Sequence, residues 1–94
     1  MNKKELIKRA YNKIILKKLE KHMPRILKLG PENLSQILLK IKQSDKLDDD
    51  IFGDFIQEIL LKKYKIHEKN PDFKPVILNF LKENHIRGIQ FPYI

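Results

Sequence analysis

The sequence predicts an all-α protein, a small bundle of four to five short helices with an extended C-terminal tail. Apolar residues recur every three or four positions over most of the chain, and no segment alternates long enough to form a sheet. Of the 94 residues, 41% are hydrophobic and 34% are charged, which is too apolar for a disordered chain and too charged for a membrane protein. A chain of this length folds as one domain, residues 1–94, and buries only about 60–65% of its unfolded surface, so its core is thin.

The first predicted helix covers about residues 3–22 and has one broad apolar face. The pattern places Leu16 outside this face, among the polar residues of the opposite side. Pro24 interrupts the helix, because the residue before a proline, here Met23, is pushed away from helical geometry. The apolar face repeats at intervals of three and four and consists of Leu6, Ile7, Ala10, Tyr11, Ile14, Ile15, Leu19 and His22.

Two shorter helices follow. A helix over about residues 24–29 begins with Pro24 in its first turn and ends at Gly30. Pro31 then opens a helix over about residues 31–43, where its missing N–H costs nothing. The inner stripe of that helix consists of Leu34, Ile37, Leu38 and Ile41.

The clearest helical periodicity lies in about residues 49–65. Asp48 is the expected N-cap, since a short acidic side chain there accepts a hydrogen bond from a free backbone N–H. The apolar face of this helix consists of Ile51, Phe52, Phe55, Ile56, Ile59, Leu60 and Tyr64. A last short helix, about residues 75–84, has the apolar residues Val76, Ile77, Phe80 and Leu81.

The tail, residues 85–94, differs from the rest of the chain. Ile89, Phe91 and Tyr93 alternate with other residues, and Pro92 forbids a helix. With no second strand in the sequence, these three side chains either pack on their own domain or form a site for a protein partner. We favour packing on the domain, because a thin core needs the aromatic rings.

The positive charge is concentrated near the N-terminus. The chain has 20 Lys and Arg against 12 Asp and Glu, a net charge of +8, and residues 1–29 hold the whole excess because only Glu5 and Glu20 oppose the cations there. This asymmetry favours a polyanionic partner or an anionic surface, although abundant lysine also keeps a small protein in solution. The candidate nucleic-acid-binding residues are Lys3, Lys4, Lys8, Arg9, Lys13, Lys17, Lys18, Lys21, Arg25 and Lys28.

The sequence lacks the motifs and spacings that most catalytic and metal sites need. There is no Cys, which removes disulfides, thiolate zinc sites and cysteine nucleophiles, and the three glycines stand too far apart for a phosphate-binding loop. A calcium loop beginning at Asp48 fails, because Ile59 occupies the position that requires a bidentate Glu. His22, His67 and His85 have no second ligand three or four residues away. We therefore expect no enzyme, no catalytic residue, no metal and no cofactor.

The apolar runs are too short for membrane or secretory segments. The longest have three residues, as at 76–78, whereas a spanning helix needs about 20 and a secretory signal about 7–15. The sequence thus predicts a cytoplasmic or organellar-matrix protein that is neither secreted nor transmembrane. A cleaved mitochondrial presequence is disfavoured, because the basic N-terminus is rich in Lys rather than Arg and has no Ser before position 35.

Residues 30–38, Gly-Pro-Glu-Asn-Leu-Ser-Gln-Ile-Leu, resemble the first helix of the paired-helix repeats in octotricopeptide and FAST-kinase-like organellar RNA-binding proteins. Those repeats continue with an acidic residue and an apolar pair that lead into the second helix, and here the corresponding residues are Asp49, Asp50, Ile51 and Phe52. The match covers about residues 31–61 and a single repeat. It departs from the family pattern at one place. The small residues that usually let the paired helices approach are replaced here by Lys40, Ile41 and Lys42. The resemblance implies an RNA-associated helical hairpin.

The favoured function is binding of nucleic acid, RNA or a ribonucleoprotein rather than a specific duplex-DNA site. The cations of residues 1–29 would neutralise phosphates, which gives affinity without sequence information, and the dominance of Lys over Arg argues against base readout. The alternative is a protein–protein interaction module: an assembly factor, an immunity or inhibitor protein, a small regulator or a homodimer, using an apolar groove and the tail. A membrane surface is disfavoured, because Lys18 lies near the middle of the apolar arc of the first helix.

Overall fold

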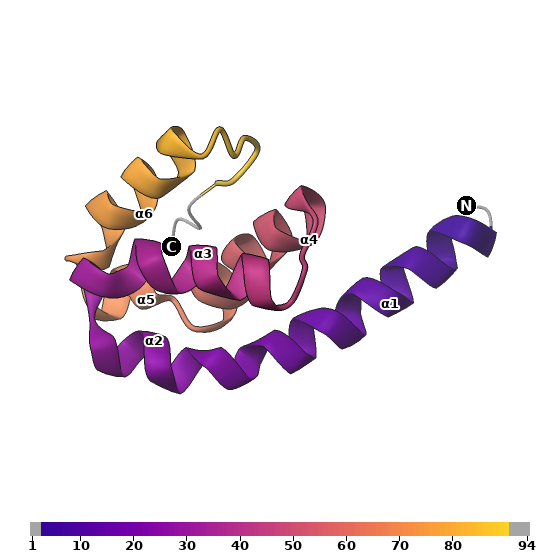
Figure 1. The fold of residues 1–94 in the computed structure, drawn as a ribbon, viewed down its shortest axis with the longest axis horizontal. Coiled ribbons are helices and arrows are strands. Elements are labelled where there is room, and N and C mark those ends of the chain that lie inside the picture. Colours follow the sequence, from indigo (N-terminus) through magenta and orange to yellow (C-terminus); the bar gives the residue numbers. More distant parts are fainter. Residues whose placement is uncertain (1–2, 91–94) are drawn as a thin grey trace.

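The computed structural model describes the backbone of residues 3–90 and the side chains of residues 10–90. Every regular element in that part of the chain is helical, so the predicted all-α class is confirmed (Figure 1). In chain order the elements are α1 (Lys3–Leu19), η1 (Glu20–His22), α2 (Met23–Leu29), η2 (Pro31–Asn33), α3 (Leu34–Ser44), α4 (Asp49–Asp54), η3 (Phe55–Lys63), α5 (Ile66–Lys69) and α6 (Phe73–Glu83).

The first three elements form one curved rod, and the N-terminal half of α1 projects beyond the other helices (Figure 1). The predicted departure of Met23 from helical geometry is wrong, because its φ is −61° and its ψ is −43°. The chain instead tightens into the 3₁₀ turn η1 just before Pro24, which then occupies the first turn of α2, where no N–H is needed. The rod ends as predicted at Gly30. The φ of this residue is +83°, a left-handed value that glycine adopts without steric cost.

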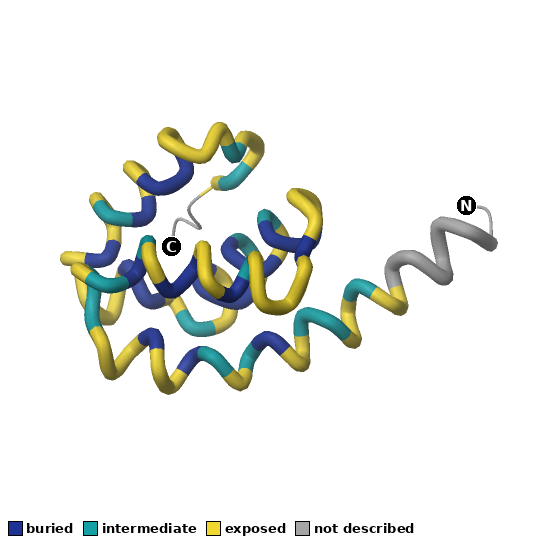
Figure 2. Tube along the Cα trace, viewed as in Figure 1, coloured by how far each residue is buried: buried dark blue, intermediate teal, exposed yellow. Residues whose placement is uncertain are grey.

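The face of the rod that meets the core is rotated from the predicted one. Leu19 and Met23 are buried, and Leu16, which the sequence pattern placed among polar residues, packs against the core. By contrast, Tyr11 and Ile14 from the predicted apolar face are 61% and 56% exposed. The reason is that α4 and η3 pack on α1 where it joins the globule, whereas its earlier turns extend past them (Figure 2).

The stripe predicted for the third helix is confirmed, since α3 buries Leu34, Ile37, Leu38 and Ile41. α3 packs on α6. It ends in a Schellman turn, in which the N–H of Leu47 donates to the carbonyl of Lys42 at 3.0 Å. Within this turn Lys46 takes a left-handed φ of +51°, a conformation that glycine usually supplies.

The single helix predicted over residues 49–65 is divided into α4 and the π-helix η3. Asp48 caps α4 as predicted, because its carboxylate accepts the backbone N–H of Ile51 at 2.8 Å. In η3 the backbone hydrogen bonds join residues five apart rather than four. Each turn therefore takes in an extra residue, which brings Leu61 into the core although an α-helical pattern leaves it outside.

The last two helices differ from the prediction at their starts. α5 is a short helix that the sequence did not predict, and it buries Ile66. α6 begins at Phe73, two residues before the expected start, and Pro75 is tolerated because it lies in the first turn. The predicted apolar side is otherwise confirmed, because α6 buries Ile77, Phe80 and Leu81.

Four phenylalanines fill the centre of the core, each at most 1% exposed: Phe52, Phe55, Phe73 and Phe80. The rings of Phe52 and Phe80 meet edge to face with their centroids 5.8 Å apart. This contact joins α4 to α6, which are distant in sequence. The buried residues of these helices and of α3 face one another across the globule (Figure 2).

The tail packs on its own domain as far as residue 90. Ile86 and Ile89 are half-buried against the core. The side-chain amide of Gln57 holds the backbone of Gln90 with two hydrogen bonds: its Nε2 donates to the carbonyl at 2.7 Å, and its Oε1 accepts the N–H at 2.8 Å. One side chain thus supplies the donor and the acceptor that a neighbouring strand would offer.

Candidate nucleic-acid interface

The outer side of the rod, turned away from the core, carries exposed cations. We call them the basic face: Lys13, Lys17, Lys18, Lys21, Arg25 and Lys28. Lys13, Lys17 and Lys21 follow one another at intervals of four residues, which is roughly 6 Å of helix rise. Within the described residues, none of the six forms an ion pair. The structure therefore brings six of the ten predicted nucleic-acid-binding residues together on the rod formed by α1, η1 and α2.

The other predicted site residues are not part of this surface. Four side chains of the predicted nucleic-acid set lie outside the described residues: Lys3, Lys4, Lys8 and Arg9. Phe91 and Tyr93 of the predicted protein-interaction set also lie outside them. Ile89, the third member of that set, is half-buried against its own core.

Glu20 is the one carboxylate among residues 10–29, and both of its oxygens are bound by residues from another part of the chain. The Nζ of Lys63 donates to its Oε1 at 2.7 Å, and the hydroxyl of Tyr64 donates to its Oε2 at 3.2 Å. Lys63 is the last residue of η3 and Tyr64 follows it directly. The sequence analysis missed both partners, because they lie 43 and 44 residues away without a local signal. Glu20 therefore pairs with Lys63 rather than with a lysine of the basic face, although the charge of Lys17 also acts on it.

The ion pair shifts the pKa of both groups. The hydrogen bond from Lys63 lowers the pKa of Glu20 below its ordinary value of 4.5, against a partial opposing effect of burial. The charge of Lys63, the hydrogen bond from Tyr64 and the charge of Lys17 lower it further. The same hydrogen bond raises the pKa of Lys63 above its ordinary value of 10.5.

The pair stabilises the fold only while Glu20 is ionised and Lys63 is protonated. Because folding lowers the pKa of Glu20, its contribution is present above pH 4.5 and is lost as the pH falls through the folded-state pKa. Because folding raises the pKa of Lys63, that contribution is present below pH 10.5 and is lost as the pH rises through the folded-state pKa. We expect Glu20→Gln to have a lower melting temperature than wild type at pH 7 and the difference to be smaller at about pH 3, where wild-type Glu20 is more protonated.

Thermal unfolding at a series of pH values checks this result. Glu58→Gln is the matched control, because the Glu58 carboxylate accepts a hydrogen bond from Lys62 at 3.2 Å on the exposed side of η3. Exposed pairs of this kind stabilise little, so its melting temperature should stay close to that of wild type at every pH. If the melting temperatures of Glu20→Gln and wild type differed equally at pH 7 and about pH 3, the ionised Glu20–Lys63 pair would not be the source of the stabilisation.

The basic face has no aromatic ring among the described side chains. Tyr11 is exposed on a flank of the rod, and the phenylalanines of the described chain are buried in the core. Stacking of nucleic-acid bases needs an exposed ring. The basic face is therefore suited to the phosphate backbone and not to the reading of unpaired bases.

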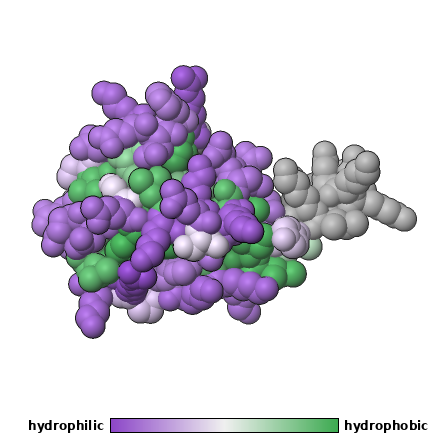
Figure 3. Space-filling view, viewed as in Figure 1, coloured by the Kyte–Doolittle hydropathy of each residue, from purple (hydrophilic) through white to green (hydrophobic). Residues whose placement is uncertain are grey.

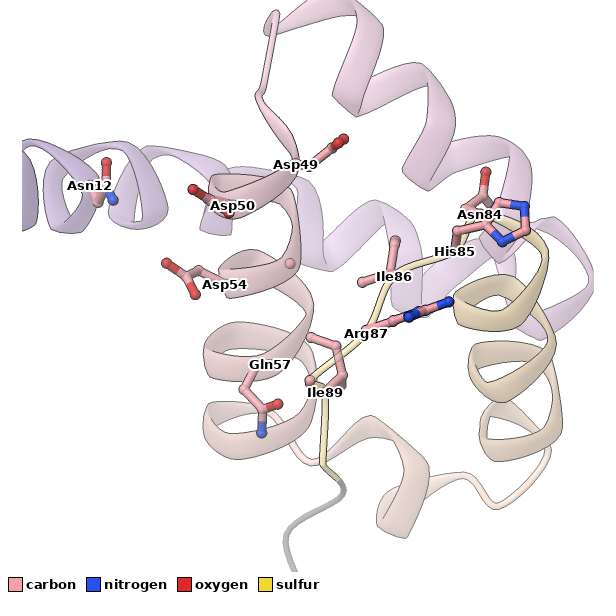
Figure 4. Close-up of a pocket in the computed structure, with 12 residues that line it drawn as sticks. Asn12, Asp49, Asp50, Asp54, Gln57, Asn84, His85, Ile86, Arg87 and Ile89 are labelled. Atoms are coloured by element: carbon pink, nitrogen blue, oxygen red, sulfur yellow. The ribbon is translucent and has the colours of Figure 1, made fainter.

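A groove of about 640 Å³ opens on another side of the molecule, between α4, the start of η3 and residues 84–89. Figure 4 shows the carboxylates of Asp50 and Asp54 on the same side of α4, with Arg87 pointing away from them. Asp49 also lines the groove, yet no group of three or more His, Cys, Asp or Glu side chains in the described chain could hold a metal ion. The groove is lined mainly by α4 and residues 84–89 and by none of the cations of the basic face, so it is not part of the candidate interface.

The fold and the basic face define a small helical protein with a cationic rod. No protein-family model matches the chain, and no match was found among curated proteins or solved structures. The resemblance of residues 31–61 to organellar RNA-binding repeats therefore stays a prediction. Among residues 3–90, no helix is both long enough and apolar enough to cross a membrane.

Proposed function

We propose that the protein binds nucleic acid, RNA or a ribonucleoprotein in particular, through the basic face, and that it has no enzymatic activity. One observation carries the proposal: six exposed cations share one rod, and the one carboxylate of residues 10–29 is withdrawn to η3. Such a partner also fits the cytoplasmic or organellar-matrix location that we expect.

The geometry of the rod supports contact with a phosphate backbone. From Lys13 to Lys28 the basic face extends roughly 22 Å along the helix axis, so several phosphates can be neutralised at once. Neutralised phosphates release their counterions, which supplies affinity that falls with salt. Five of the six cations are lysines, and a lysine ammonium contacts a phosphate as a point charge without the two-pronged geometry that reads guanine.

Fluorescence anisotropy with labelled single-stranded RNA, duplex RNA and duplex DNA tests the proposal. We expect the logarithm of the association constant to fall linearly with the logarithm of the salt concentration, with a slope of about −3 to −5 if four to six phosphates are contacted. We expect RNA to bind at least as tightly as DNA. No binding to any of the three at the lowest salt would overturn the proposal.

A further inference from the structure

A second surface lies on the flank of the rod, where α1 faces the turn between α3 and α4. Here a notch of about 410 Å³ has an apolar floor and a charged rim. We call it the α1 notch. Its floor is formed by Tyr11, Ile15, Leu19, Leu47 and Ile51, and its rim by Lys18, Lys21, Asp45, Lys46 and Asp48.

The floor presents an apolar row of helical length. Tyr11, Ile15 and Leu19 follow at intervals of four residues and span roughly 12 Å of α1. The row begins at the exposed ring of Tyr11, next to the exposed side chain of Ile14. Figure 3 shows hydrophobic surface where α1 joins the globule, beside the residues drawn in grey. An amphipathic helix, with apolar residues every three or four positions, has the spacing that such a row fits.

The rim has cations without ion-pair partners and carboxylates that are already engaged. Asp45 contacts the Nε2 of His22 at 3.0 Å, and Asp48 accepts the N–H of Ile51 at 2.8 Å. The ammonium groups of Lys18, Lys21 and Lys46 form no ion pair within the described chain. The turn places Lys46 on the rim in a left-handed conformation that costs free energy for any residue except glycine. The charge that would complement this rim is negative.

We propose that the α1 notch binds an acidic amphipathic helix of a partner protein. The apolar side of that helix lies on the exposed Tyr11 and the half-buried Ile15, above the buried Leu19, and its carboxylates meet Lys18, Lys21 and Lys46. A second copy of this chain is a poor occupant, because it would bring another rod with the same excess of lysines against the first. The notch shares Lys18 and Lys21 with the basic face but extends beyond it to Tyr11 and Lys46, and those two residues distinguish this proposal from nucleic-acid binding.

The probe is a synthetic 16-residue helical peptide with leucines at intervals of three and four and glutamates at the remaining positions. Its matched control keeps the leucines and replaces every glutamate with lysine. Binding is followed by anisotropy, and the site is mapped by amide chemical shifts of the labelled full-length protein. We expect the acidic peptide to bind and the basic peptide not to bind, with the largest shifts at Tyr11, Lys18 and Leu47.

Variants at exposed positions separate this site from general electrostatic attraction. Lys46→Glu should weaken binding of the acidic peptide roughly fivefold, as expected for reversal of an exposed charge that meets a carboxylate. Tyr11→Ala should weaken it about tenfold, because an aromatic anchor is lost. Lys13→Glu makes the same charge change on the basic face outside the notch and should weaken binding less than about twofold at physiological salt.

Three results would overturn the proposal. The first is equal binding of the acidic and basic peptides. The second is a set of shifts centred on Lys13 and Lys17 instead of the notch, with Lys46→Glu no more harmful than Lys13→Glu. The third is self-association that sedimentation detects and Tyr11→Ala abolishes, because the notch would then be an interface between copies. Nucleic-acid binding of Lys46→Glu, measured alongside, reports separately on the basic face.

Discussion

Replacement of Phe52 with alanine is expected to lower the free energy of unfolding by about 3–5 kcal/mol. Phe52 is 1% exposed, and its ring meets the edge of Phe80 with the centroids 5.8 Å apart. The Nζ of Lys42 lies 5.4 Å from the centroid of the same ring. Truncation would leave a cavity between α4 and α6 and remove both ring contacts, because the surrounding side chains can relax only in part. A small domain with about 5–15 kcal/mol of total stability would lose a large share of it.

Urea unfolding followed by circular dichroism measures this loss. Leu39→Ala is the control, because Leu39 is an apolar helix residue of α3 that is 40% exposed, and its replacement should cost less than about 1 kcal/mol. Phe52→Leu keeps most of the volume and should fall between the two. If Phe52→Ala and Leu39→Ala were equally destabilised, the packing of α4 on α6 would not be the centre of the core.

Local periodicity was enough to predict the helices whose burial depends on their own pattern. α3 buries the four residues expected of it, and Asp48 caps α4, because both features are set by residues within one or two turns. Periodicity could not predict the buried side of α1, because that side depends on where α4 and η3 end. The result is that Leu16 packs on the core and Ile14 faces solvent.

Each wrong or missed element has its own physical cause. Leu61 belongs to the core only because η3 is a π-helix, and the sequence has no accepted signature for that change of winding. Met23 stays helical before Pro24, directly after the 3₁₀ turn η1, which residue periodicity does not mark. The short helix α5 contains only four residues, too few for a periodic pattern to mark it.

The sequence predicted which cations form the candidate site, but not that the nearby carboxylate of Glu20 pairs with residues outside it. The lysines and the arginine of residues 13–28 were evident from the sequence, and all of them are exposed in the structure. Glu20 instead accepts hydrogen bonds from Lys63 and Tyr64, and only the packing of η3 against the rod brings these partners within reach. The α1 notch is formed in part by the turn between α3 and α4, so it could not be predicted from the sequence of α1 alone.

Loss of three lysines from the basic face is expected to reduce nucleic-acid affinity far more than loss of three lysines elsewhere. The test variant is Lys13→Ala/Lys17→Ala/Lys28→Ala, which leaves the rim of the α1 notch intact. If each lysine contacts one phosphate, the slope of log affinity against log salt should become shallower by about 2–3, and affinity at 0.1 M salt should fall by about 100-fold. Alanine is a good helix former and these side chains are exposed, so the fold should be retained.

The control for this variant changes the net charge by the same amount on other elements. Lys40, Lys69 and Lys82 are exposed on α3, α5 and α6, away from the rod. Their replacement by alanine should weaken binding by less than about threefold at 0.1 M salt, because charges farther than a Debye length of about 10 Å from the phosphates are screened. The comparison separates a contact surface from a diffuse positive charge. If the two triple variants lost affinity equally, nucleic acid would respond to the charge of the whole chain, and the withdrawal of Glu20 would have no part in binding.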